Sequence, residues 1–419
     1  MGGASGISFS NAIWLLPVGV DVMRTPRNND RFTFSAVAKD ICMNKTILVL
    51  LCGVGTVLFC FRGLAPAQYL DYSFAANAKN GERIYKSGCV SCHGKDGKGA
   101  PESISAFERP DSFPDFTRCD QTTAEVNTAY RAVIEHGGPT RGFSQIMPSF
   151  AEALSSQEVD DVVAYLRHFC RNPHWPAGEL NLPRALVTEK AYPEDEEVIS
   201  TAVNVQGAPG NESHIIHEQR FGVKNQIEVD VPVNFQNQSH TWYGGIGDIT
   251  LAAKRVMFSS LRTGSILSLQ GGFLLPSGNR ARGFGSGSTS FETFAAYDQV
   301  FRTDTFVQLQ FGATLPFRTS IAPQSIFFNS AVGQSFAADH GLGRLWSPMC
   351  EFVAARDLVD EAKTDWDVVP QMQVTISRRQ HIRANLGLSI PATNTQGRQK
   401  QVMFYILWDW QDGKLTEGW

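Results

Sequence analysis

The sequence lacks several features that would direct it toward common functions. Neither half of the 419-residue chain carries a basic run and the formal net charge is −4, so its electrostatics give no reason to expect nucleic-acid binding. It contains no nucleophile motif, phosphate-binding loop or dinucleotide fingerprint. His214 and His217 form a close pair, but their i, i+3 spacing places them on opposite faces of a strand and disfavours a metal site. These absences argue against an enzyme.

One short motif stands out, Cys-Val-Ser-Cys-His at residues 89–93. Cys89 and Cys92 lie one helical turn apart, so both thiols can add to the two vinyl groups of a haem while His93 ligates its iron. A zinc site would need a second Cys/His pair at ligand spacing, and a redox dithiol expects a strand–helix–strand context; the sequence offers neither. The motif therefore predicts one covalently attached haem c, held by Cys89, Cys92 and His93.

A six-coordinate haem needs a second axial ligand. Four downstream residues are candidates: His136, Met147, His168 and His174. Met147 is followed by proline and comes just before a predicted helix start. His136, at the end of a helix, is expected to be a surface residue placed favourably at the negative end of the helix dipole.

Helices are predicted downstream of the motif. Two capping boxes mark helix starts, one formed by Thr122 with Glu125 and the other by Ser155 with Glu158. The first of these helices is expected to stop at Gly137. A weaker helical stripe leads into the cysteine motif from the N-terminal side.

Residues 74–170 resemble a class I monohaem cytochrome c in the order of helix, Cys-x-x-Cys-His, second helix, Met-Pro and terminal Tyr-Leu-Arg helix. In that family the methionine before proline is the sixth ligand, so the resemblance assigns Met147; a methionine filling a gap in the core is the alternative. The first and last helices of the family also cross. The crossing would bring together four residues: Gly81, Tyr85, Tyr165 and Leu166.

The N-terminal stretch is interpreted as a targeting region. Residues 43–67 combine a short positive start, an apolar run and a small-residue cleavage pattern, which predicts a secretory signal peptide with a mature N-terminus at Gln68. An uncleaved anchor is the alternative, although about 16 apolar residues are short for a span of roughly 20. Because signals belong at the N-terminus, residues 1–42 are interpreted as a mis-called extension upstream of Met43.

Export also bears on the remaining cysteines, since disulfides persist outside the cytoplasm. Cys119 and Cys170 flank the helical core and could form a bridge, a pairing that the sequence leaves open. Cys350 would then be a packed lone thiol. The cytochrome region is taken as 68–170, followed by a proline-rich, acidic linker over 171–195 that no helix could span. Four apolar linker residues could pack on either neighbouring domain: Leu180, Leu182, Leu186 and Val187.

From 196 to 419 the hydrophobic period changes from 3.6 to 2. The clearest alternating runs are 227–235, 307–315, 368–376, 382–390 and 402–410, with weaker ones at 197–206, 213–222, 247–258, 264–275, 290–301, 325–337 and 344–356. They predict 10–12 strands of about ten residues, the length that crosses a bilayer at a tilt. A short turn at 378–380 and a long one at 278–288 fit an outer-membrane β-barrel; a water-soluble sandwich or barrel is the alternative.

A class I cytochrome followed by a barrel resembles outer-membrane cytochrome–porin fusions in domain order. The expected fold is therefore an all-α cytochrome c domain followed by an antiparallel β-barrel. The expected function is haem c electron transfer at or across the outer membrane of a Gram-negative envelope, with the haem domain in the periplasm. Expected partners are periplasmic redox proteins and outer-membrane lipid. Two alternatives remain: an outer-membrane pore with a haem plug or sensor domain, and a soluble periplasmic carrier that serves a dehydrogenase.

Overall fold

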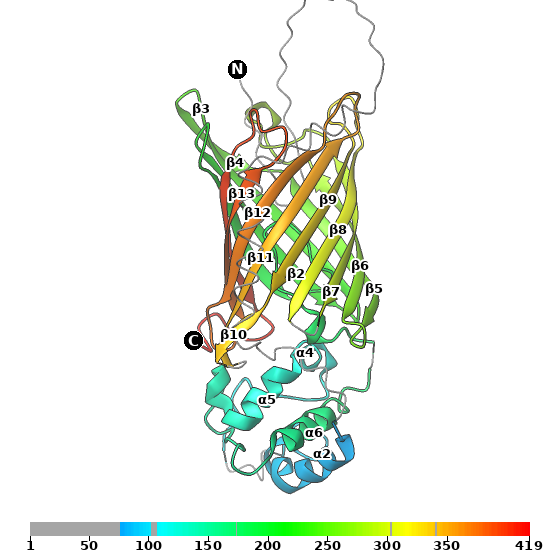
Figure 1. Ribbon diagram of the computed structural model, residues 1–419, viewed down its shortest axis with the longest axis vertical. Helices are drawn as coiled ribbons and strands as arrows, with labels where there is room; N and C mark the ends of the chain where they lie inside the picture. The colour runs from blue at the N-terminus through cyan, green and yellow to red at the C-terminus, as the bar shows by residue number, and fades with distance from the viewer. Residues whose placement is uncertain (1–75, 102–106, 173, 302–303, 340–341) are drawn as a thin grey trace, which may run out of the picture.

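The computed structural model describes residues 76–419 except 102–106, 173, 302–303 and 340–341. A helical part sits at one end of a long β-barrel (Figure 1). The predicted N-terminal extension 1–42 and signal peptide 43–67 lie outside the described residues. Among the helices described, none has the length and apolar character needed to cross a membrane.

The helical part contains a series of short helices: α2 (Ala78–Ile84), η2 (Tyr85–Cys89), α3 (Val90–His93), α4 (Cys119–Thr122), α5 (Asn127–His136), η4 (Gly138–Arg141) and α6 (Ser156–Leu166). The predicted capping box of Ser155 and Glu158 is confirmed at the start of α6. The box predicted for Thr122 and Glu125 is wrong: Thr122 ends α4, and α5 begins at Asn127 without a side-chain cap from the preceding residue. The predicted stop is confirmed, because Gly137 follows α5 with a φ of +82°.

Helices α2 and α6 cross in the core of the helical part. The rings of Tyr85 and Tyr165 lie 5.3 Å apart, as the resemblance implied. Gly81 makes the closest approach of the two backbones, since a Cβ on it would lie 1.8 Å from the carbonyl oxygen of Asp161. Gly81 thus contacts α6 at Asp161, one helical turn before the predicted Tyr165 and Leu166. The two backbones are closest at this glycine because it has no side chain to separate them.

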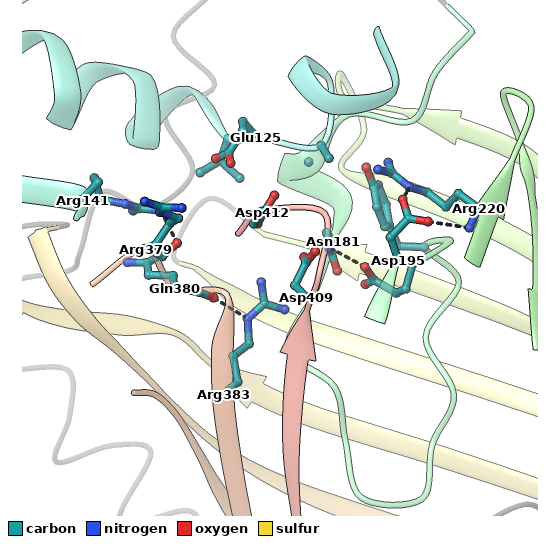
Figure 2. A pocket seen from close by; sticks show the side chains of 15 residues that line it. Glu125, Arg141, Asn181, Asp195, Arg220, Arg379, Gln380, Arg383, Asp409 and Asp412 are labelled. Carbon is teal, nitrogen blue, oxygen red and sulfur yellow. Dashed lines mark hydrogen bonds and ion pairs between the residues drawn. The ribbon is translucent and has the colours of Figure 1, made fainter. Parts of the chain in front are cut away.

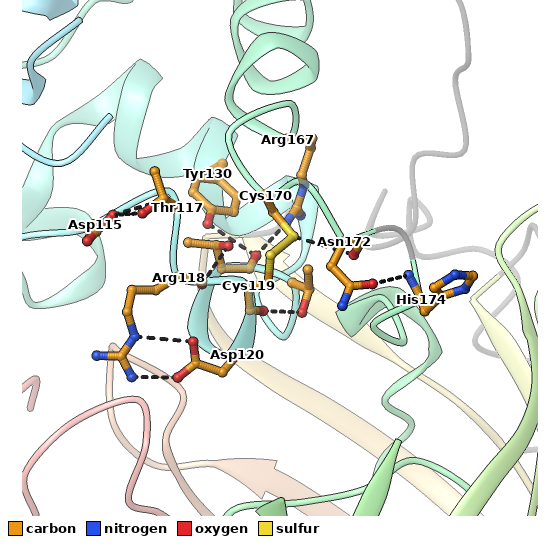
Figure 3. Close-up of a disulfide and its surroundings, with 12 residues drawn as sticks. Asp115, Thr117, Arg118, Cys119, Asp120, Tyr130, Arg167, Cys170, Asn172 and His174 are labelled. Carbon is orange, nitrogen blue, oxygen red and sulfur yellow. Dashed lines mark hydrogen bonds and ion pairs between the residues drawn. A yellow bond between two sulfur atoms is a disulfide. The ribbon is translucent and has the colours of Figure 1, made fainter. Parts of the chain in front are cut away.

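A disulfide joins Cys119, the first residue of α4, to Cys170, which follows α6 (Figure 3). Their Cα atoms lie 5.1 Å apart, and the two cysteines are 51 positions apart in the sequence. The bridge ties the C-terminal end of the helical part to the segment that leads into α5. Cys350 is a buried free thiol in the barrel.

The remainder of the chain forms antiparallel strands. Their bounds are β1 (Glu196–Asn204), β2 (Gly210–Phe221), β3 (Asn225–Gln238), β4 (Thr241–Ile246), β5 (Ile249–Ser260), β6 (Ser265–Leu275), β7 (Ser290–Val300), β8 (Thr305–Pro316), β9 (Ser325–Gln334), β10 (Phe336–Asp339), β11 (Leu342–Asp357), β12 (Asp365–Thr375), β13 (Ile382–Pro391) and β14 (Gln401–Asp409). Strand β1 pairs with β14, and β9 pairs with β11, so the sheet closes on itself. Strand β4 pairs only with β3, and β10 pairs only with β11, so neither belongs to the closed ring. The ring therefore has 12 strands, within the predicted range.

The two faces of the barrel wall differ in polarity. On β3, Ile227 and Phe235 are 41% and 47% exposed, whereas Glu228 and Asp230 between them are buried. Apolar side chains are likewise exposed on the outer face of strands around the ring; they include Ile199, Ile215, Leu251, Leu269, Phe311, Leu386 and Ile406. A water-soluble barrel would bury its apolar face, whereas an apolar outer band around a polar interior is the pattern of a membrane barrel.

His214 and His217 follow the same alternation on β2. His214 is fully buried and its Nδ1 lies 2.9 Å from the carboxylate of Asp230. The side chain of His217 is 40% exposed, and its ring stacks on Trp410. The prediction that the two imidazoles face opposite sides of a strand is confirmed.

The proline-rich stretch 171–195 connects the two parts of the molecule, but residues 182–195 lie inside the barrel. We call this segment the plug. Nearly all of its residues are buried, and they hydrogen-bond to inward side chains of strands on all sides of the ring: Gln226 of β3, Asp298 of β7, Gln308 of β8, Glu351 of β11, Gln373 of β12 and Tyr405 of β14. The apolar linker residues pack on the barrel, where Leu186 and Val187 join a core cluster with Val369 and Leu407.

Candidate haem site

His93 is held in place by the loop that follows it. It ends α3, and Gly94 leaves the helix with a φ of +72°. The Tyr85 hydroxyl donates to the Gly94 carbonyl (2.7 Å), and the Gly99 N–H donates to the His93 carbonyl (2.9 Å). The glycine-rich segment after His93 thus folds back onto the histidine and fixes its backbone.

The imidazole of His93 is packed between aromatic rings. Its centroid lies 5.1 Å from that of Phe113 and 5.2 Å from that of Phe116. Burial lowers the pKa of His93 to about 4, so the ring is neutral, which is the form that ligates metals. The Nδ1 atom is buried and has no hydrogen-bond partner within the described part of the chain. These features suit an imidazole that serves as a haem ligand.

Cys89 and Cys92 are free, half-buried thiols in the turns just before His93. Cys89 ends the π-helical turn η2 and packs against the core cluster of the helical part, which includes Ile84 and Val159. The wide turn of η2 precedes the α-helical turn that carries Cys92 and His93. The structure therefore brings all three residues of the motif to one end of the α2–α3 segment.

Met147 lies in the loop after η4, which backbone hydrogen bonds attach to α5. Its carbonyl accepts from the Gly138 N–H (3.0 Å), and the Phe150 N–H donates to the Ile134 carbonyl (2.9 Å). A Cβ on Gly138 would lie 2.2 Å from the Ser144 carbonyl oxygen, so the loop requires glycine there. This arrangement holds Met147 against the same core cluster that Cys89 contacts.

The other candidate ligands point elsewhere. The side chain of His136 is 44% exposed, as predicted for a surface residue, and it lies 3.9 Å from Glu135. His168 is exposed, and its Nδ1 lies 2.7 Å from the carbonyl of Ala164. His174 is also exposed. Of the four candidates, Met147 is the one that packs into the core beside the cysteine motif.

A line of neighbouring side chains leads from His93 toward the barrel. Phe116 contacts His93, and its centroid lies 6.4 Å from that of Tyr130. The guanidinium of Arg167 lies 4.7 Å from the centroid of the Tyr130 ring. Arg167 also lies 3.7 Å from the carboxylate of Glu179, which precedes the plug. Sequence reasoning missed this connection, because contacts between residues so far apart in the chain leave no local pattern.

Polar contacts fix the helical part to the mouth of the barrel. Arg379, in the turn between β12 and β13, donates to the Gly142 carbonyl (2.8 Å), and Arg141 donates to the Arg379 carbonyl (3.3 Å). On the other side of the mouth, Arg220 of β2 donates to the Asp120 carbonyl (2.8 Å). The two parts thus meet through hydrogen bonds on both sides.

The space between the two parts is a small charged pocket (Figure 2). Arg141, Arg379 and Arg383 line it together with Glu125 and Asp412. Burial raises the pKa of Glu125, and burial together with the charge of Glu125 raises the pKa of Asp412 to about 7. Glu125, predicted to cap a helix, lines this junction instead, because Glu179 takes the position at the start of α5.

Comparison with known proteins identifies the helical part. Residues 76–166 match the family described as cytochrome C oxidase, cbb3-type, subunit III. One of the subunits of nicotinate dehydrogenase from Pseudomonas putida is 33% identical over 91 residues, which make up 21% of this chain and 7% of that protein. The chain therefore spans a small fraction of that relative. The helical part is a cytochrome c domain, and the predicted fold class is confirmed.

Solved outer-membrane proteins are similar to the barrel half. An outer membrane channel from Pseudomonas putida F1 aligns over 52% of this chain and 97% of its own, at 13% identity and a TM-score of 0.35. The KdgM porin aligns over 51% of this chain and 98% of its own, at 10% identity and a TM-score of 0.31. The evidence that the barrel is a membrane barrel is the distribution of its side chains, with apolar ones on the outer face and polar ones on the inner face.

Proposed function

We propose that this protein is a haem c electron carrier fixed to the outer membrane by its barrel. The observation that carries the proposal is the attachment of a cytochrome c domain to one end of a closed barrel whose outer face is apolar. An apolar band of this kind is stable in lipid and costly in water. The barrel therefore supports a membrane location and argues against a soluble periplasmic carrier.

The residues of the cytochrome domain fit one covalently attached haem. Cys89 and Cys92 would hold it through thioethers, and His93 and Met147 would ligate its iron. Bound haem supplies a reversible one-electron couple, and ligation by histidine and methionine favours a raised potential. The chain's own part is to keep His93 neutral, to orient it with Phe113 and Phe116, and to position Met147.

The turns of the barrel support a periplasmic position for the haem domain. Outer-membrane barrels have short periplasmic turns and longer extracellular loops. At the haem end, 222–224 and 261–264 each connect two strands in a short turn, whereas the longer segments 276–289 and 392–400 connect strands at the far end. A disulfide in the cytochrome domain also suits an oxidising compartment.

The proposed partners are periplasmic redox proteins that deliver electrons to, or take them from, the haem domain. Likeness of the cytochrome region to part of a nicotinate dehydrogenase supports a dehydrogenase as one class of donor. The buried junction with the barrel leaves the remaining surface of the cytochrome domain for such encounters.

Membrane fractionation of the expressed protein tests the proposal. We expect haem-stained protein in the outer membrane with a gel mobility that changes on heating, as a closed barrel requires. The matched control is the double variant Cys89→Ala/Cys92→Ala, which should keep the heat-dependent shift and lose the haem stain. A haem-stained protein that is soluble without detergent would overturn the membrane assignment, and haem retained covalently by the double variant would overturn the attachment site.

A further inference from the structure

The inner wall of the barrel is strongly acidic. Nine buried acidic side chains lie on its strands: Glu196, Glu218, Glu228, Asp230, Glu292, Asp298, Glu351, Asp367 and Asp409. Among the strand residues whose burial the structure describes, Lys254 is the only buried lysine or arginine. An aqueous passage lined in this way would favour cations, because acidic rings select for them.

The plug makes a specific docking contact on one of these carboxylates. The backbone N–H groups of Leu186, Val187 and Thr188 all donate to Glu351, at distances of 2.9, 3.1 and 2.5 Å. The Thr188 hydroxyl (2.6 Å) and the Gln371 amide (2.5 Å) donate to it as well. Successive backbone N–H groups that converge on one anion form a nest, and Glu351 is fully buried.

Two basic residues of the plug match the acidic wall. Arg184 donates to Glu196 (2.8 Å) and Glu218 (2.7 Å). Lys190 is fully buried; its ammonium lies 3.9 Å from the wall carboxylate of Glu196 and is also ion-paired with Glu194 of the plug itself. The plug thus places two cations against wall carboxylates, and each of these cations would be costly to bury without its partners.

Further bonds fix the path of the plug. The Ala191 N–H donates to Asp298 (2.8 Å), the Glu194 N–H donates to Gln226 (2.7 Å), and the Tyr405 hydroxyl donates to the Arg184 carbonyl (2.7 Å). Contacts to opposite sides of the ring leave the segment held across the lumen.

We propose that the plug seals the barrel, which therefore acts as a non-conducting anchor, and that the wall behind it is a latent cation-selective passage. The proposal rests on the membrane location proposed above and is independent of haem binding. It assigns the closure to residues 182–195 and not to the haem domain, which lies outside the barrel (Figure 1). In this proposal a peptide segment, and not the haem domain, closes the barrel, and the barrel anchors the protein without conducting.

Planar-bilayer recording on the full chain tests the closure. The wild type should give no channel openings, whereas the triple variant Glu351→Gln/Arg184→Gln/Lys190→Gln should conduct, with a reversal potential shifted toward the K⁺ equilibrium value in a KCl gradient. Glutamine at 351 keeps the size of the side chain but replaces one of its two acceptor oxygens by an amide donor, so it cannot accept from all three plug N–H groups as the carboxylate does. Openings by the wild type, a silent folded triple variant, or anion selectivity would each overturn the proposal.

The matched control is Glu292→Gln. Glu292 also faces the lumen, but its carboxylate accepts from Thr314 and makes no hydrogen bond to the plug within the described part of the chain. This variant should remain silent. Openings from it equal to those of the triple variant would show that loss of an acidic wall charge, and not release of the plug, opens the barrel.

Hydrogen exchange on the wild type tests the docking without any substitution. The amides of residues 186–188 and 191 should exchange at least tenfold more slowly than those of the loop 276–289, because wall carboxylates hold them. Exchange as fast as in that loop would overturn the docking. Failure of the protein to enter the outer membrane would instead refute the proposed location, so the two failures are distinguishable.

Discussion

The Glu179 carboxylate accepts a hydrogen bond of 2.9 Å from the backbone N–H of Asn127, 52 residues earlier in the chain. Asn127 is the first residue of α5, whose N-terminal N–H groups receive no side-chain cap from the preceding residue. The segment that enters the barrel therefore supplies the cap of a cytochrome helix. Gly178 reinforces the joint, because its N–H donates to the Thr123 carbonyl (2.7 Å).

Replacing Glu179 by Ala should weaken the attachment of α5 to the barrel. Loss of a helix cap typically costs about 0.5–2 kcal/mol, and Arg167 would lose its nearby carboxylate. Denaturant titration of the haem absorbance should show a lower midpoint, while the heat-dependent gel shift of the barrel stays the same. Glu179→Gln keeps an acceptor oxygen and should recover most of the loss. Equal midpoints for Glu179→Ala and the wild type would contradict the capping role.

Replacing Met147 by Ala should remove the sulfur–iron absorption band and lower the midpoint potential, because methionine ligation raises it. Ile146, the exposed neighbour, provides the control: Ile146→Ala should leave both the band and the potential unchanged. The measurements are an optical spectrum and a redox titration. An unchanged spectrum for Met147→Ala would show that a different residue ligates the iron.

An arginine on the outer face should reveal the lipid contact. Ile199 is 57% exposed near the middle of β1 and lies in register with Ile215 and Ile406 on the neighbouring strands. Ile199→Arg should cost about 2–4 kcal/mol if this face meets the bilayer midplane, whereas Val205→Arg, just beyond the strand end, should cost about 0–1 kcal/mol. Refolding into lipid vesicles across a urea series measures both. Equal, small costs would indicate that the face is exposed to water.

Acid should weaken the crossing of α2 and α6. Burial raises the pKa of Asp161, but hydrogen bonds from Asn80, the Asn77 N–H and Gln157 outweigh it and hold the pKa below its usual range. A lowered folded-state pKa means that the stabilisation is complete above about pH 3.9 and is lost as the pH falls through the folded value. The stability of the cytochrome domain should therefore fall below about pH 4.

Asp161→Asn checks this assignment. It replaces an acceptor of charged hydrogen bonds and should cost about 1–3 kcal/mol at neutral pH while flattening the acid limb of the stability profile. Chemical denaturation of the haem domain at several pH values gives both quantities. An acid limb as steep in the variant as in the wild type would assign the effect to another group.

Local patterns determined much of this protein. The spacing of Cys89, Cys92 and His93 predicts covalent haem attachment; this attachment and the assignment of Met147 as the sixth ligand both stay predictions. Alternation of apolar and polar residues predicted the strands closely, because each side chain of a strand must face either lipid or lumen. Runs such as 382–390 and 402–410 coincide with β13 and β14 to within a residue.

Only the tertiary structure decided where the irregular segments go. Residues 182–195 have no period, since together they contact several different strands of the closed ring, and the docking of Thr188 on Glu351 joins positions 163 residues apart. Thr122 and Glu125 fit a capping box by local rules, yet Glu179 takes the start of α5 once the barrel places it there. Periodicity is a property of neighbours in the chain, whereas a plug and its wall become neighbours only when the barrel closes.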